Sequence, residues 1–196
     1  MQDKHINCEM CPDCLDEQSD ELWMVYYEQY YEAVKVINEE NKRSNNGLLL
    51  PMLLLLAQYM EIWMKAIAAN YGAGKYGEIE ADVIYGHKPE ELMQKMVDII
   101  SEEEWEQNQD KISQIDNIYA WFNDMTENKV PLSIAMRYPK TKENHSSLCS
   151  CILNCVSGEC DRFDAKQCYL GVRKILKLTY EVYDNIYNFR IAMQEG

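Results

Sequence analysis

One arginine and one histidine lie close together on the polar segment "SIAMRYPKTKENHSS", and their chemistry suits RNA cleavage. Seven residues separate Arg137 from His145. A histidine with a near-neutral pKa can move protons to and from a ribose hydroxyl, while an arginine stabilises the charge that develops on phosphate. Pro139 disfavours a regular helix between them, so helical geometry does not fix their distance. The pair is a candidate catalytic site, and the alternative that we favour is a solvated loop with a structural arginine and a surface histidine.

Positive side chains gather in the last third of the chain. Residues 1–128 carry 9 Lys and Arg against 26 Asp and Glu, whereas residues 129–196 carry 10 against 7. The net charge of −14 by itself argues against nucleic acid, because phosphate contacts need positive side chains. The uneven distribution still permits a basic face near the C-terminus, and it makes the acidic part suited to a basic protein partner. The candidate RNA-binding residues are Lys140, Lys142, Arg173, Lys174 and Lys177.

Eight cysteines carry a second chemical signal. Short spacings between thiolates suit tetrahedral zinc, but the C-x-C-x3-C-x4-C pattern of the later group matches no standard finger or ribbon, and it is not diagnostic of an iron–sulfur cluster. We expect no metal or other cofactor, with a structural zinc as the first alternative and disulfide or redox chemistry as the second. The candidate zinc ligands are Cys8, Cys11, Cys14, Cys149, Cys151, Cys155 and Cys160.

Length and composition indicate one soluble domain. A chain of 196 residues with 47% hydrophobic and 27% charged residues is long enough for one real core. Its first residues contain no apolar run, so we expect no secretory signal. Free thiols without a signal are typical of a reducing compartment, and we therefore expect a cytoplasmic protein.

The elements that must position these residues follow a helical period. Six residues between positions 23 and 37 recur at helical spacing and predict one amphipathic helix. Its tyrosines are interpreted as core residues, with a stacking platform for bases as the alternative. The six are Trp23, Tyr26, Tyr27, Tyr30, Val34 and Ile37.

Residues 48–69 are almost wholly apolar and predict the central helix of a bundle. Gln58, Glu61 and Lys65 interrupt the run, which leaves too short an uncharged stretch to cross a bilayer comfortably. We therefore expect no membrane partner. Glu61 and Lys65 are spaced to form an ion pair within the helix, and the alternative is a buried polar couple that lines a site.

Further helices are predicted to begin at Pro89, at the capping box of Ser101 with Glu104, and at about Ala165. No useful stretch has the period of a strand. The sequence thus predicts an all-α, single-domain bundle of about five helices at 21–196. It follows a cysteine-containing tail at 1–20 and holds a cysteine-rich insertion at about 140–168.

Three short patterns resemble those of HEPN (higher-eukaryote and prokaryote nucleotide-binding) domains over roughly residues 22–139. They are "LLAQYMEIWMKAIAANYG", with Glu61 and Lys65 four apart, "GHKPEELMQKM", with His87 before a helix, and "SIAMRYP". The family signature is an arginine followed a few residues later by a histidine. The seven residues between Arg137 and His145 are more than that signature has, which puts catalysis by this pair in doubt.

The resemblance implies a helical domain, often dimeric, of prokaryotic toxin–antitoxin, phage-defence or RNA-processing systems. Active members are metal-independent endoribonucleases that act at or near a dimer interface. We expect a homodimer that is associated with RNA and has a degenerate or absent ribonuclease site. The alternative is a non-enzymatic acidic module, or a phage-encoded inhibitor, that engages a basic partner protein. A small structural metal protein is a third possibility.

Overall fold

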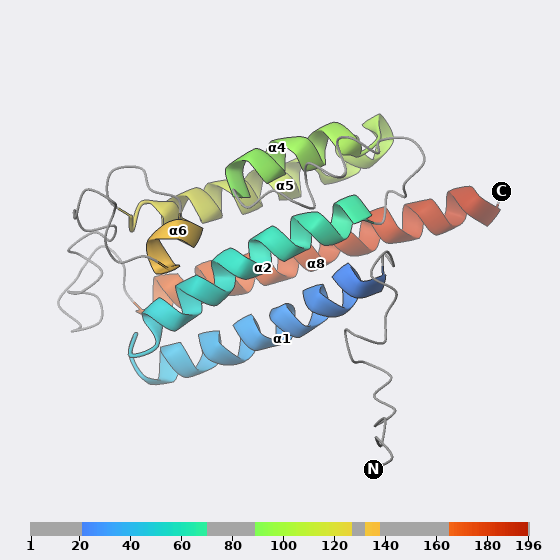
Figure 1. Ribbon diagram of the computed structural model, residues 1–196. Helices are drawn as coiled ribbons and strands as arrows, with labels where there is room; N and C mark the ends of the chain where they lie inside the picture. Colours follow the sequence, from blue (N-terminus) through green and yellow to red (C-terminus); the bar gives the residue numbers. More distant parts are fainter. Residues whose placement is uncertain (1–20, 70–88, 127–131, 138–164, 196) are drawn as a thin grey trace, which may run out of the picture.

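The computed structural model describes residues 21–69, 89–126, 132–137 and 165–195 (Figure 1). Within these ranges the chain is helical and contains no strand, so the predicted all-α bundle is confirmed. The short α6 (Leu132–Arg137) accompanies five bundle helices, which are α1 (Glu21–Arg43), α2 (Leu49–Ala69), α4 (Pro89–Ile99), α5 (Glu102–Asn123) and α8 (Ala165–Glu195).

Helix α2 lies at the centre of the bundle, as its composition predicts. It contacts α1, α4, α6 and α8, and α1 lies on the opposite side of α2 and α8 from α4 and α5 (Figure 1). Leu56, Met60 and Trp63 are fully buried. By length and composition alone, α2 is the one helix in the described ranges that could cross a membrane, and most of its span is buried inside the protein. A buried core helix meets the same criterion.

The turn between α1 and α2 is built by asparagines. Asn45 and Asn46 adopt left-handed backbone conformations, with φ of 50° and 69°, which asparagine tolerates better than most residues. The Asn41 side chain accepts a hydrogen bond from the Leu48 amide at 3.0 Å and donates one to the Asn46 side chain at 3.2 Å. These bonds hold the reversal that lays α1 against α2.

Helix α8 packs against α5 through buried polar groups. The predicted capping box is present, because the Ser101 hydroxyl accepts from the Glu104 amide and the Glu104 carboxylate accepts from the Ser101 amide. The same carboxylate accepts from Arg190 Nε on α8 at 3.0 Å. One turn further along, Asn185 donates to Asn108 at 3.0 Å. The two helices are therefore joined by paired polar side chains.

Helix α8 packs against α1 and α2 through aromatic rings. The ring of Tyr27 stacks on Tyr183 at 4.8 Å and on Tyr59 at 5.8 Å between centroids. The hydroxyls of Tyr59 and Thr179 form a hydrogen bond, and the Trp63 indole donates to the Thr179 carbonyl at 3.1 Å. These contacts fix how closely α8 approaches α1 and α2.

Candidate functional site

The predicted catalytic pair falls largely outside the described residues. Arg137 is the last residue of α6, but its side chain is not described, and neither are His145, Lys140 and Lys142. Catalysis by Arg137 and His145 therefore stays a prediction. The same is true of His87.

The predicted zinc ligands also lie outside the described residues. These are Cys8, Cys11, Cys14, Cys149, Cys151, Cys155 and Cys160. Cys168, in the first turn of α8, is buried. Across the described ranges, no group of three or more His, Cys, Asp or Glu side chains could hold a metal ion.

The basic residues predicted on the last helix lie on the surface of α8. Arg173, Lys174 and Lys177 are all exposed. Arg173 and Lys177 line a shallow hollow of about 620 Å³ between α1 and α8, together with Lys35. Its positive charge is partly compensated, because Lys177 lies 3.6 Å from Glu181. The remaining lining residues are Tyr31, Glu39, Tyr169, Leu176, Tyr180 and Glu181.

Glu61 and Lys65 form an ion pair inside the core. Their charged atoms are 2.8 Å apart, and both side chains are buried. Lys65 Nζ also lies 5.3 Å from the centre of the Trp23 ring, so aromatic packing from α1 covers the pair. Neither residue lines the hollow above or the second α1–α8 cavity, which favours a structural role.

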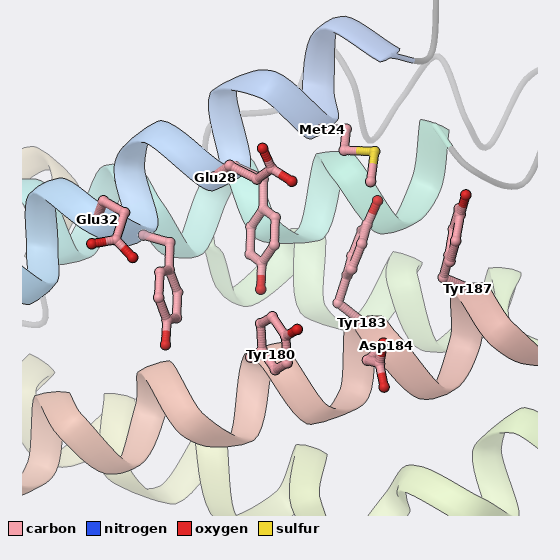
Figure 2. A pocket seen from close by; sticks show the side chains of 9 residues that line it. Met24, Glu28, Glu32, Tyr180, Tyr183, Asp184 and Tyr187 are labelled. Carbon is pink, nitrogen blue, oxygen red and sulfur yellow. The ribbon is translucent and has the colours of Figure 1, made fainter.

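The second cavity continues the groove between α1 and α8 and has a different lining. It holds about 420 Å³ and shares Tyr31 and Tyr180 with the hollow beside Arg173. Figure 2 shows Met24, Glu28 and Glu32 on α1 facing Tyr180, Tyr183 and Tyr187 on α8. We call it the tyrosine groove. Its lining residues are Met24, Tyr27, Glu28, Tyr31, Glu32, Tyr180, Tyr183, Asp184 and Tyr187.

Two rings of the tyrosine groove form a parallel pair. The planes of Tyr183 and Tyr187 differ by 9°, and their centroids are 6.3 Å apart. Tyr183 is buried and is held in place by stacking on Tyr27, whereas Tyr187 is 39% exposed. A phenol is neutral at physiological pH at its ordinary pKa of 10.0, and burial raises the pKa of Tyr27 further. Tyr27 therefore offers an aromatic face rather than charge.

The rim of the tyrosine groove carries negative charge. Glu32 is paired with Lys35 at 2.9 Å. Glu28 and Asp184 are exposed, and neither has a Lys or Arg partner within the described residues. Among the residues that the structure describes, none that lines this cavity is basic. Aromatic faces with unneutralised carboxylates make a site for a cation, because the negative face of each ring and the carboxylates attract positive charge together.

Sequence reasoning did not find the tyrosine groove as a site. Tyr27 is buried, as the predicted stripe requires, whereas Tyr187 on the last helix is partly exposed. The signal available was the spacing of Tyr180, Tyr183 and Tyr187 at i, i+3 and i+7, which places three rings on one side of a helix. Only the position of α1 decides that these rings border a cavity.

Comparison of the chain with protein-family models, with curated proteins and with solved structures finds no match. The chain is therefore described by its fold, an all-α bundle of five helices, and by the tyrosine groove.

Proposed function

We propose that this protein is a non-enzymatic binding module whose tyrosine groove engages a basic segment of a partner protein. The observation that carries this proposal is the lining of the 420 Å³ cavity, whose described residues include five tyrosines and three carboxylates and no basic side chain. Aromatic rings beside carboxylates suit the binding of a cation, because both attract positive charge.

The charge of the whole chain supports the same partner. With a net charge of −14, the protein attracts a basic segment from a distance and speeds its association at low salt. The groove then adds short-range contacts, because a cation over a tyrosine face is favoured most where water is partly excluded. Long-range attraction thus brings the partner close, and the rings and carboxylates select where it binds.

Calorimetry with short basic peptides tests this proposal. Peptides that alternate glycine with lysine or arginine are expected to bind, whereas a matched glutamate peptide does not. The double variant Glu28→Gln/Asp184→Asn removes two rim charges and is expected to weaken binding about tenfold. Glu102→Gln/Glu103→Gln, on the exposed first turn of α5, removes the same charge elsewhere and is the matched control. Basic peptides that bind no better than the acidic one would overturn the proposal.

A second candidate function is association with RNA, as a HEPN-like homodimer of a prokaryotic defence or toxin–antitoxin system with a degenerate or absent ribonuclease site. The observation that favours it is the exposed set of Arg173, Lys174 and Lys177 on α8, two of which share a hollow with Lys35. Positive side chains beside tyrosine rings are typical of surfaces that bind single strands.

Incubation of purified protein with a mixed RNA pool in EDTA tests this second candidate. A degenerate site predicts no cleavage, together with RNA binding that Arg173→Glu/Lys177→Glu abolishes. Cleavage that Arg137→Ala and His145→Ala both remove would instead establish a metal-independent ribonuclease. Absence of both binding and cleavage would remove RNA from consideration.

A further inference from the structure

The geometry points to an arginine side chain as the group that the tyrosine groove selects. This inference rests on the proposed function, because it specifies which cation of a basic partner segment enters the cavity. It is carried by one feature of the lining that a merely acidic surface would not have. The rings of Tyr183 and Tyr187 are parallel to within 9°, with centroids 6.3 Å apart.

Parallel rings distinguish between the two common cationic side chains. A guanidinium is planar, stacks on aromatic faces and is weakly hydrated, whereas the lysine ammonium is compact, tetrahedral and strongly hydrated. We call the space between the rings of Tyr183 and Tyr187 the slot. A guanidinium at its mouth would lie within about 6 Å of both ring centres, the range over which a cation is attracted to an aromatic face. A lysine ammonium gains less from two parallel faces because it has no plane to lay against them.

The two rings differ in burial in a way that suits entry of a planar group. Tyr183 is buried and stacks on Tyr27 at 4.8 Å, so its position is fixed by the core. Tyr187 is 39% exposed, and rotation of its side chain widens the slot without disturbing buried packing. Stacking a guanidinium between two rings needs a slightly wider separation than the 6.3 Å between these centroids, and rotation of the Tyr187 side chain provides it.

Two carboxylates that line the same cavity match the N–H donors of a guanidinium. Asp184 lies on α8 between the two tyrosines in sequence, and Glu28 projects from α1 on the other side of the cavity (Figure 2). Neither is neutralised by a Lys or Arg of the described residues. A guanidinium has five N–H donors, which allows it to reach a carboxylate while its faces contact the rings. Met24 adds an apolar surface for the alkyl part of the side chain.

Calorimetry with three peptides of equal length and charge tests the inference. They alternate glycine with arginine, with lysine or with trimethyllysine. The arginine peptide is expected to bind about five- to tenfold more tightly than the lysine peptide. Tyr187→Leu keeps an apolar side chain but removes the ring, and it is expected to abolish this preference. Tyr187→Phe keeps the ring and the preference.

The controls distinguish failure of the arginine preference from failure of the proposed function. Tyr26→Leu changes a tyrosine of α1 outside the groove and is expected to leave both affinities unchanged. Equal binding of arginine and lysine peptides, tightest binding of trimethyllysine, or a preference that survives Tyr187→Leu would each overturn the arginine slot. Binding of none of the three would overturn the proposed function itself. Thermal unfolding of each variant verifies that it is folded.

Discussion

Helix α8 is packed against α5 on one side and against α1 on another, and the two contacts differ in their polar pairing and in how tightly they close. Against α5, the polar groups of Glu104 and Asn108 are paired with Arg190 and Asn185. Against α1, Asn38 donates to the Tyr169 carbonyl at 3.1 Å, and tyrosines line a cavity of about 420 Å³. We call these the α5–α8 contact and the α1–α8 contact.

The difference shows how one helix can serve both stability and binding. A buried charged group is tolerated only when it is paired, so the α5–α8 contact specifies one arrangement of its helices. The carbon atoms of tyrosine rings need no hydrogen-bond partners. The α1–α8 contact can therefore leave a cavity beside the rings. We therefore expect substitutions in the α5–α8 contact to affect mainly folding and those in the tyrosine groove to affect mainly binding.

The largest effect is expected from Phe122→Ala in the α5–α8 contact. Phe122 is fully buried, and its ring lies so close to Gly171 that a Cβ there would be 3.2 Å from it. The substitution leaves a cavity that neighbouring side chains cannot fill, and it should lower the free energy of unfolding by about 3–5 kcal/mol. Urea unfolding followed by circular dichroism measures this loss. A change below about 1 kcal/mol would mean that α5 and α8 do not pack as described.

Glu104→Ala should be next in size. The carboxylate belongs to a residue that is 2% exposed, and it accepts hydrogen bonds from Arg190 and from the Ser101 amide. Its removal breaks the capping box and leaves a partly buried arginine without that acceptor, at a cost of about 2–3 kcal/mol. Glu102→Ala, on the same turn but exposed, should change stability by less than about 0.5 kcal/mol. Equal effects of the two substitutions would contradict the buried pair.

Alkaline pH tests the α1–α8 contact. Burial raises the pKa of Tyr27 above its usual 10.0, so the unfolded chain loses this proton at a lower pH than the folded protein does. The corresponding stability is fully present below pH 10 and is lost as the pH rises toward the folded pKa, at about 1.4 kcal/mol per pH unit. Tyr27→Phe removes this contribution, so its unfolding free energy should fall less steeply above pH 10. Urea titrations at several alkaline pH values measure the slope, and identical slopes would contradict the prediction.

The smallest stability effect is expected from Tyr187→Leu in the tyrosine groove. Because Tyr187 is partly exposed and has room around it, the free energy of unfolding should change by less than about 0.5 kcal/mol. Thermal unfolding measures this. A large loss would mean that the ring of Tyr187 supports the fold rather than a ligand, and the contrast between the two contacts would fail.

Much of the architecture follows from local patterns. The capping box of Ser101 and Glu104 predicts the start of α5, and the apolar run after Gly47 predicts a central α2. The start of α8 at Ala165 is also as predicted. These features depend on residues within a few turns of one another, which is why periodicity and capping rules find them.

The partners of these residues do not follow from local patterns. Glu104 was interpreted as a cap, and its contact with Arg190 joins positions 86 residues apart. The stacking of Tyr183 on Tyr27 and its place in a cavity were not predicted either. Such pairings depend on how far each helix is rotated about its axis and on how closely two helices approach.

The sequence by itself determined that this protein is an all-α bundle with a buried α2, because helical periodicity and hydrophobic burial act along the chain. It also determined a strongly acidic charge, with its basic residues concentrated near the C-terminus. Only the tertiary structure decided that α8 meets α5 through paired polar groups and meets α1 through a partly open aromatic groove. The reason is that a side chain's partner is set by the packing of helices distant in sequence, whereas its tendency to be buried is set by its neighbours along one helix.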